Sequence, residues 1–457
     1  MPKPNVLFIL TDQQRWDTTG VHANPLGLTP QFDRLAQTGT HFTHAFTPQP
    51  VCGPARAVLQ TGRYATNTGC FRNGIPLPEE QFTLARAFRA AGYRTGYIGK
   101  WHLGPPDAVG PVPAALRGGY QDWLAANLLE FTSDAYRTTL YDEAGCPVRL
   151  PGYRVDALTD AAIRYIDRWQ SQPFFLFLSY LEPHFQNTRD DYPAPDGYAE
   201  QYQGRWLPPD LAGLPGSAHQ HSAGYFGMVK RLDEALGRLL DALKSLGLLE
   251  DTLVVFTSDH GNHFKTRNSE YKRSCHESSL RIPLAIDGPG FHGGGRIEQL
   301  TSLVDLPPTL LDAAGLPVPD FMEGRSLLPL VRRQGLDGPD EVFVQISESQ
   351  VGRALRTPRW KYSVRMPTGD PSAGNTRPAA NVYAEDCLYD LLADPYEFRN
   401  LVQHAAYAQV RADLRARLLD WIARVEGAAP QIVEAEITEP VGQRTLEPQT
   451  FSSERTE

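Results

Sequence analysis

Polar and ionisable side chains follow four short apolar stretches of this sequence. The stretches are residues 6–10, 95–98, 174–179 and 253–257. Their length suits strands better than helices, and open α/β sheets bind ligands beyond the carboxyl ends of their strands. The residues in that position are Asp12, Gln13, Lys100, His102, His184, Asp259 and His260. We therefore expect these acids, bases and amide to meet at one edge of a sheet.

Four of these residues are candidate ligands of one divalent metal ion: Asp12, Gln13, Asp259 and His260. Carboxylate and amide oxygens are the ligands that a hard cation prefers, and a cation would offset the repulsion between two carboxylates. Taken singly, each residue could equally be a turn or helix cap after a strand. Only the combination predicts a metal site.

A second group of candidates lies around Cys52, where Cys-Gly-Pro-Ala-Arg at 52–56 is followed by Thr-Gly-Arg at 61–63. An isolated cysteine is more often a small buried hydrophobic residue than a nucleophile. The whole segment, however, resembles the signature of formylglycine-dependent sulfatases, in which this cysteine is oxidised to Cα-formylglycine. The resemblance covers residues 5–330 and includes Gly-Lys-Trp-His-Leu-Gly at 99–104, Thr-Ser-Asp-His-Gly at 257–261 and Glu-Ser-Ser-Leu-Arg-Ile-Pro at 277–283. Residues 388–401 also resemble the C-terminal region of the family.

The resemblance implies a sulfuric-ester hydrolase whose nucleophile is formylglycine at position 52, hydrated and bound to the metal ion. One hydroxyl of the hydrate would attack sulfur, and deprotonation of the other would release sulfate. Cys52 is thus implied as a metal ligand as well. Arg56 is expected to hold the hydrate, and Lys100 and His102 to contact its hydroxyls, with His102 as the base for elimination.

By the same resemblance, His184 and Lys272 should bind the sulfate and the leaving-group oxygen. His184 is our choice of general acid because the ordinary pKa of histidine lies near neutrality. Lys272 is assigned by its position five residues before Glu277, while Lys265 and Arg273 are nearby alternatives. Polar residues of the same loop could shape a pocket for an anionic or sugar substrate, or could be ordinary loop polarity: His263, Lys265, Arg267, Cys275 and His276.

The chain departs from the family pattern at its metal positions. Many sulfatases carry a pair of acids first and Asp-Asn last, whereas this chain has Asp12-Gln13 and Asp259-His260. We expect Ca²⁺, although an imidazole ligand also suits Mn²⁺, Zn²⁺ or another divalent ion. Ala55 replaces a serine often found in the signature, and we expect the partner that modifies Cys52 to tolerate it. That partner would be a formylglycine-generating enzyme or an anaerobic sulfatase-maturating enzyme.

Two other functions compete with this interpretation. Phosphonate monoester or phosphodiester hydrolases of the same superfamily share the Asp-Gln and Cys-Gly-Pro-Ala-Arg segments, but Lys100 and His102 flanking Trp101 favour sulfate esters. Trp101 itself is expected to pack rather than to catalyse. A non-catalytic binding protein of this fold would be expected to lack nucleophile or metal positions, and all are present here. Aryl, alkyl and carbohydrate sulfates are all candidate substrates.

The elements that must position these residues predict an α/β fold. A fifth strand-like stretch is at 283–286, and helical patterns separate the stretches, as in a mainly parallel sheet with helices on both faces. One helix is predicted at 31–38, with Thr29 as its cap and Pro30 at its first position. Another has a one-sided apolar stripe: Val229, Leu232, Leu236, Leu239, Leu240 and Leu243. The resemblance implies the alkaline-phosphatase-like α/β/α sandwich with a smaller C-terminal domain built on an antiparallel sheet.

The pattern divides the chain into a catalytic domain (1–335), a smaller α+β domain (336–433) and a polar tail (434–457). The boundary lies in a linker-like stretch at 332–340 that is rich in glycine and charge. The smaller domain should contain strands at 341–346 and 360–364, the segment 388–391 and a helix at about 406–425.

Composition excludes several other classes. The 457 residues are 41% hydrophobic and 21% charged, with a formal net charge of −9, which argues against nucleic acid as a partner. The five cysteines are scattered without a Cys-x-x-Cys spacing, so we expect reduced thiols. No signal peptide precedes the first strand-like stretch, so we expect a cytoplasmic protein. The longest apolar run, 174–181, is too short to cross a membrane.

Overall fold

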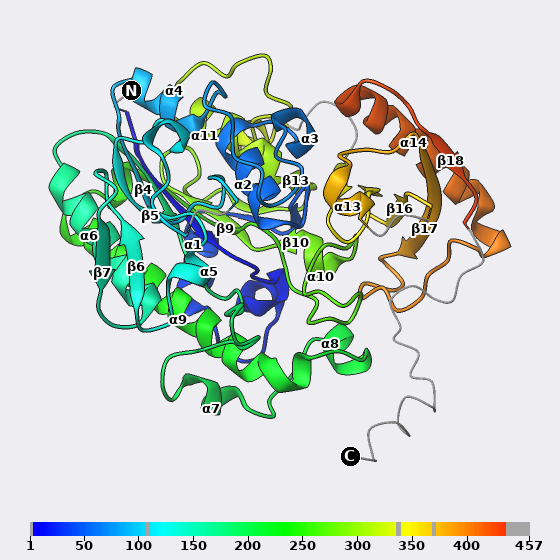
Figure 1. Ribbon diagram of the computed structural model, residues 1–457, viewed down its shortest axis with the longest axis horizontal. Coiled ribbons are helices and arrows are strands. Elements are labelled where there is room, and N and C mark those ends of the chain that lie inside the picture. The colour runs from blue at the N-terminus through cyan, green and yellow to red at the C-terminus, as the bar shows by residue number, and fades with distance from the viewer. Residues whose placement is uncertain (1–2, 107–108, 335–339, 368–371, 436–457) are drawn as a thin grey trace.

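The computed structural model describes residues 3–106, 109–334, 340–367 and 372–435 and contains a large mixed sheet, a small sheet and a C-terminal sheet (Figure 1). The large sheet has the strand order β12-β2-β11-β9-β1-β8-β4-β5-β6-β7. In that order its strands are Gly295–Ile297, Thr40–Phe42, Leu284–Asp287, Thr252–Ser258, Asn5–Thr11, Phe174–Ser179, Arg94–Lys100, Asp122–Ala126, Thr138–Tyr141 and Pro147–Leu150. The five central strands, β9, β1, β8, β4 and β5, are all parallel to their neighbours in this group. The prediction of a mainly parallel sheet is confirmed.

The central strands form where the sequence has uninterrupted apolar runs. Every residue of β1, β8 and β9 is buried, as expected for parallel strands covered on both faces. The stretch predicted at 283–286 forms β11, which is antiparallel to β9. The strands β5, β6 and β7 were not predicted.

Helices cover both faces of the sheet, and alternate side chains of β1 separate the two cores. Val6, Phe8 and Leu10 pack with α2 (Cys52–Thr61), α4 (Leu84–Ala90) and α11 (Leu306–Ala313). Leu7 and Ile9 pack with α1 (Pro30–Thr38), α6 (Arg154–Trp169) and α9 (Ala218–Ser245). This α/β/α arrangement confirms the predicted fold class.

The predicted helices at 31–38 and 229–243 are present as α1 and within α9. Five of the six stripe residues of α9 are buried, and Leu240 is half-buried. The predicted cap of α1 is wrong, because the Thr29 side chain makes no capping bond and instead accepts from Gly20 N. The Asp233 carboxylate of α9 accepts from Gln31 N and Phe32 N at 3.0 and 2.8 Å, so a distant acid satisfies the helix N-terminus.

Short elements connect this framework. The small sheet has the order β10-β3-β13, formed by Arg281–Ile282, Ala45–Phe46 and Thr301–Ser302. The short helices are α3 (Ala65–Thr68), α5 (Leu129–Thr132), α7 (Tyr198–Tyr202), α8 (Pro209–Gly213), α10 (Glu277–Leu280), α12 (Leu328–Val331) and α13 (Ala373–Thr376). Six 3₁₀ turns complete the described part: Trp16–Thr18, Gly20–His22, Ala114–Leu116, Leu249–Asp251, Leu303–Asp305 and Ala405–Tyr407.

The C-terminal sheet lies beside the larger domain, with α14 (Ala408–Glu426) on its outer side (Figure 1). Its strands β14 to β18 follow chain order: Val342–Ile346, Gly352–Arg356, Trp360–Arg365, Val382–Asp390 and Gln431–Val433. All neighbours are antiparallel except β17 and β18, which are parallel. The strands β15 and β18 were not predicted. The proposed boundary at residues 335–336 and positions 436–457 of the expected tail lie outside the described residues.

Candidate active site

The predicted residues of the four strand ends converge on Cys52, the first residue of α2. Cys52 Sγ lies 2.8 Å from Lys272 Nζ, 3.2 Å from His260 Nε2, 3.6 Å from Asp12 Oδ1 and 3.9 Å from Lys100 Nζ. The side chain is buried, with 1% of the residue exposed. Burial alone would raise the pKa of the Cys52 thiol, but Lys100, Lys272 and His260 lower it well below its ordinary value.

The start of α2 is fixed by residues from other segments. Val51 is extended and offers no side-chain cap, whereas Asn73 Oδ1 accepts from Gly53 N at 2.8 Å. A Cβ at position 53 would lie 2.9 Å from the same Asn73 oxygen, so a side chain there would have to displace this acceptor. Asn73 N in turn donates to Glu348 Oε1 of the C-terminal part at 2.7 Å. The position of Cys52 therefore depends on both parts of the chain.

Two carboxylates face each other at this centre. Asp12 and Asp259 follow β1 and β9, and both are completely buried. Burial, then the charge of Asp12, raises the pKa of Asp259 to about 6. Burial also acts to raise the pKa of Asp12, but Lys100, His184 and Arg56 hold it well below its ordinary value. The pair is thus an acidic centre that depends on positive charge nearby.

His260 presents one defined nitrogen to the same centre. Its Nδ1 lies 2.9 Å from Gly261 O, a carbonyl that can only accept, so Nδ1 carries the proton of a neutral ring. Nε2 then faces Cys52 Sγ at 3.2 Å with its lone pair, and lies 3.5 Å from Asp259 Oδ1. This is the tautomer that can bind a metal ion.

The donor set fits a bound cation. Ligand atoms of Asp12, Cys52, Asp259 and His260 all lie within 4.8 Å of one another. Gln13 joins them through its backbone N, which donates to Asp259 Oδ1 at 3.1 Å. Gln13 Oε1 is a buried oxygen without a hydrogen-bond partner, and Asp259 Oδ2 makes no hydrogen bond although Arg56 Nη2 lies 3.3 Å away. A cation can satisfy both oxygens.

Arg56 bridges the acids and the backbone of β4. Its Nη2 lies 3.0 Å from Asp12 Oδ2 and 3.3 Å from Asp259 Oδ2. Its Nη1 donates to Lys100 O at 2.8 Å and to Ser179 Oγ at 2.6 Å. The guanidinium therefore contacts residues at the carboxyl ends of β1, β9, β4 and β8.

Lys100 and His102 lie near an acid, Glu130, that the sequence analysis missed. Lys100 Nζ lies 2.8 Å from Asp12 Oδ2 and 2.9 Å from Glu130 Oε1. Glu130 Oε1 is also 3.9 Å from His102 Nδ1. Burial raises the pKa of Glu130, but Lys100 and His102 lower it below its ordinary value. Glu130 follows β5, so the rule used for the other strand ends would have found it had β5 been predicted.

Lys272, rather than either alternative, reaches the centre. Its Nζ lies 2.8 Å from Cys52 Sγ and 3.3 Å from His184 Nε2. Lys265 instead pairs with Asp190 at 2.8 Å, and Arg273 pairs with Glu270 and Glu348. His184 Nδ1 donates to Phe185 O at 2.7 Å. Burial, followed by the charge of Lys272, lowers the pKa of His184.

The other residues singled out in the sequence make packing or hydrogen-bond contacts. Trp101 is fully buried and packs edge-on against Tyr97, as expected for a packing residue. His263 Nε2 lies 3.1 Å from Lys272 O, and Arg267 donates to Tyr396 O and Glu397 O of the C-terminal part. Cys275 and His276 lie beside the C-terminal sheet.

Comparison with known proteins assigns the family. Residues 4–316 match the family model described as Sulfatase. The chain belongs to the sulfatase family. The ulvan-active sulfatase of Formosa agariphila is 31% identical over 433 residues, covering 91% of this chain and 80% of that protein.

Solved structures of this sulfatase's relatives share its fold. The putative sulfatase yidJ of Bacteroides fragilis has a TM-score of 0.79 at 26% identity, covering 93% of this chain and 97% of that one. The phosphonate monoester hydrolase of Agrobacterium radiobacter has a TM-score of 0.68 at 27% identity, covering 92% of this chain and 96% of that one.

Within the described residues, no helix of this sulfatase has the length and hydrophobicity to cross a bilayer.

Proposed function

We propose that this sulfatase hydrolyses a sulfate ester at formylglycine formed from Cys52, with one divalent cation held by Asp12, Gln13, Asp259, His260 and residue 52. The observation that carries the proposal is the position of Cys52 Sγ, which lies among an acid, an imidazole and two ammonium groups. In the mature enzyme a hydroxyl of the formylglycine hydrate would take the place of this sulfur.

Two groups would supply chemistry that the twenty ordinary side chains lack. The formylglycine hydrate supplies a nucleophilic hydroxyl and a second hydroxyl whose deprotonation releases sulfate. The cation supplies a Lewis acid that lowers the pKa of a hydroxyl at position 52. Ca²⁺ is our first assignment because most donors are oxygens, and His260 makes Mn²⁺ the next candidate.

The side chains of this sulfatase orient the hydrate and move its protons. Arg56 is held by Ser179 and Asp12. Its guanidinium would bind the hydrate on the side that faces the strand ends. Lys100 would donate to a hydroxyl, while His102 accepts the proton that must leave for elimination. Glu130 Oε1 lies 3.9 Å from His102 Nδ1, so its negative charge would offset the charge that the imidazole gains in this step.

Lys272 and His184 would bind the sulfate and the leaving-group oxygen. The Lys272 ammonium offsets charge on the sulfuryl oxygens, and His184 Nε2, 3.3 Å from Lys272 Nζ, faces the same space. Because Lys272 helps to lower the pKa of His184, the negative charge of a bound sulfate is needed to favour the protonated ring. His184 would therefore become a proton donor only after the sulfate group has bound beside Lys272.

A carbohydrate sulfate is the substrate class that the surroundings support best. A cavity of about 750 Å³ beside Glu130 is lined by the exposed rings of Phe131 and Tyr136 and by Arg137 and Arg149. Aromatic rings and guanidinium groups suit a sugar that carries further anionic groups. The ulvan-active relative is consistent with such a substrate.

The decisive experiment is a panel of sulfate, phosphate and phosphonate esters, including sulfated saccharides. The enzyme would be co-expressed with a formylglycine-generating enzyme, and the tryptic peptide containing position 52 analysed by mass spectrometry. We expect sulfate esters to be turned over fastest. Predominant phosphonate turnover would support the alternative of a phosphonate monoester or phosphodiester hydrolase.

A further inference from the structure

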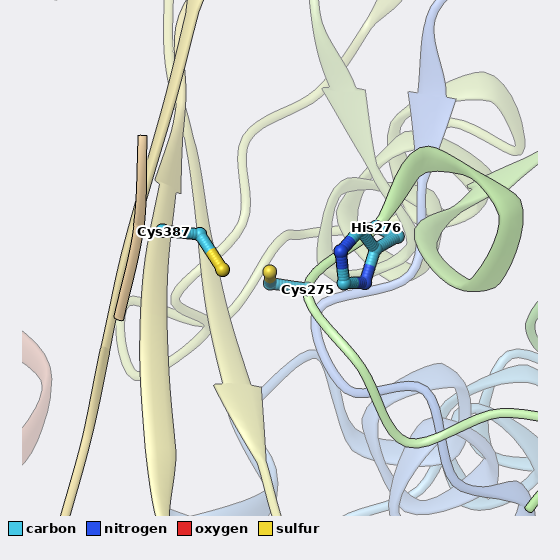
Figure 2. Close-up of side chains that lie close together, drawn as sticks. All are labelled: Cys275, His276 and Cys387. Atoms are coloured by element: carbon cyan, nitrogen blue, oxygen red, sulfur yellow. The ribbon is translucent and has the colours of Figure 1, made fainter. Parts of the chain in front are cut away.

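A second cluster of side chains that could bind a metal ion lies apart from the active site. It is found where the loop that carries Lys272 meets the C-terminal sheet. Cys275 and His276 stand at the end of that loop, and Cys387 lies in β17. Figure 2 shows the two Sγ atoms directed toward each other, with the His276 ring beside Cys275. The two sulfurs and a ring nitrogen lie within 4.8 Å of one another.

All three side chains are buried, with 2%, 3% and 0% of Cys275, His276 and Cys387 exposed. The two thiols belong to an apolar cluster that includes Leu280, Val344 and Leu391. Such surroundings accept an ion only if its charge is neutralised by its ligands. Two thiolates and a neutral imidazole give a net charge of zero with a divalent ion.

The imidazole is held in the form and orientation that a ligand needs. Its Nδ1 lies 3.1 Å from Ser274 Oγ, and its Nε2 lies 3.1 Å from Tyr389 Oη. If Nε2 binds an ion beside Tyr389 Oη, Nδ1 keeps the Ser274 hydroxyl as the partner that fixes the ring.

A fourth donor is also present. Tyr389 Oη lies 3.8 Å from Cys387 Sγ and is itself buried. Sulfur and imidazole ligands favour soft or borderline ions. Among the divalent ions of this kind, Zn²⁺ has no geometric preference of its own and commonly binds four such ligands. A monovalent soft ion such as Cu⁺ would leave a net negative charge in the apolar cluster.

We propose that Cys275, His276 and Cys387 form a structural Zn²⁺ site, with Tyr389 Oη as the fourth donor. Binding would release one proton from each thiol and involves no change of oxidation state. The ion would join the loop three residues after Lys272 to the middle of β17. It would therefore reinforce the contacts that already tie this loop to the C-terminal part, namely Arg273 with Glu348 at 2.5 Å and Ser349 Oγ donating to Arg273 O at 2.6 Å.

The proposal differs from the two simpler interpretations of a pair of buried thiols. Packing alone would place the two thiols and the imidazole together without a shared ligand, with His276 and Tyr389 Oη held only by their hydrogen bonds. A disulfide would join Cys275 to Cys387 with loss of two protons and two electrons to a cellular disulfide such as oxidised glutathione, and it would not involve His276.

Cobalt binding tests the site independently of catalysis. The full chain carrying Cys52→Ala would be purified under reducing conditions, freed of metal and titrated with Co²⁺. The substitution removes the sulfur at the active site, so Co²⁺ bound there gives no thiolate-to-cobalt charge-transfer band. We expect one equivalent of Co²⁺ to produce such a band in the near ultraviolet and Zn²⁺ to abolish it.

Variants then assign the band. In the same background, Cys387→Ser and His276→Ala should weaken Co²⁺ binding at least tenfold, whereas Cys70→Ser, which alters a buried thiol outside the cluster, should leave it unchanged. Absence of the band from the folded Cys52→Ala chain overturns the proposal without any variant. An unchanged band in Cys387→Ser, or a Cys275–Cys387 disulfide in metal-free protein from reducing lysate, overturns it as well.

Discussion

The two buried cysteine clusters of this sulfatase contain similar groups in opposite surroundings. Around Cys52 lie Lys100, Lys272 and Asp12, whereas Cys387 lies among apolar side chains. The ammonium groups overcome burial and lower the pKa of the Cys52 thiol, whereas the hydrogen bond with Cys275, together with burial, raises that of Cys387. The charged neighbours of a buried thiol, more than its depth, therefore separate a reactive position from a structural one.

The backbone also differs between the two positions. Cys52 begins a helix at the carboxyl edge of the sheet, where helix N–H groups and strand-end residues face one point. Cys387 lies in the middle of a strand whose backbone groups are used by the neighbouring strand. Only the first position places the sulfur among charged side chains from several strand ends.

Removal of the Cys52 side chain should have the largest effect on turnover. In matured enzyme, Cys52→Ala removes the nucleophile and should lower kcat for a sulfate ester by about 10⁴-fold or more. The matched control is Cys70→Ala, since Cys70 is another buried thiol and takes no part in the cluster. Full activity in a protein whose position 52 is wholly unoxidised by mass spectrometry would sink the proposed mechanism.

Loss of the Lys272 ammonium should have the next largest effect. Lys272→Ala should reduce kcat/KM by about 10²- to 10³-fold, because a positive charge close to the reacting sulfate is lost. Lys265→Ala removes a lysine of the same loop that pairs with Asp190 and should change kcat/KM little. Steady-state kinetics of the two variants would reverse our assignment if Lys265→Ala were the more impaired.

Glu130 should contribute through Lys100 and His102 rather than by touching substrate. Glu130→Gln keeps the shape of the side chain but removes its charge, so we expect a loss of about 10- to 100-fold in kcat. The pH profile should also move, because the variant removes a negative charge that lies 2.9 Å from Lys100 Nζ and 3.9 Å from His102 Nδ1. The exposed Glu80 offers a control as Glu80→Gln. A kcat within twofold of the parent, with an unmoved profile, would remove Glu130 from the mechanism.

The sequence predicted the centre of the sheet well because buried parallel strands leave a strong local signal. The strands β1, β8 and β9 are continuous apolar runs, and the residues that follow them form the site. The signature around Cys52 indicated Arg56, and the position before Glu277 indicated Lys272. These features are local in sequence, so no knowledge of distant contacts was needed.

The features that were missed depend on contacts between distant segments. β15 contains Arg353 and Arg356, which look unsuited to a buried strand until Glu426 and Glu277 are brought beside them. The cap of α1 comes from Asp233, about two hundred residues away. Cys275 and Cys387 are likewise far apart in sequence, and their spacing follows no zinc-binding pattern, so only the fold brings them together.

The pH dependence of catalysis should report His184. Its pKa in the free enzyme lies below the ordinary value of 6.5, because the buried, Lys272-flanked ring resists protonation. A general acid must carry its proton, so kcat/KM should decline as the pH rises. The decline should begin at a pH lower than 6.5 and approach about tenfold per pH unit. His184→Gln should lose this limb, whereas the exposed His219→Gln should keep it. A limb that persists in His184→Gln would assign the proton to another group.

The smallest effect on turnover should come from Cys387→Ser, which tests the other side of the comparison. Arg273 and Ser349 still hold the Lys272 loop in this variant, so kcat should stay within about twofold of the parent. Stability should respond instead. A Zn²⁺ concentration 1,000 times the dissociation constant should stabilise the parent by about 4 kcal/mol, and Cys387→Ser should lose this increment. Thermal unfolding with and without Zn²⁺ measures the difference, with Cys70→Ser as the control. Equal stabilisation of Cys387→Ser and Cys70→Ser by Zn²⁺ would mean that the ion binds elsewhere. The two cysteine clusters would then differ only in the side chains that surround their thiols.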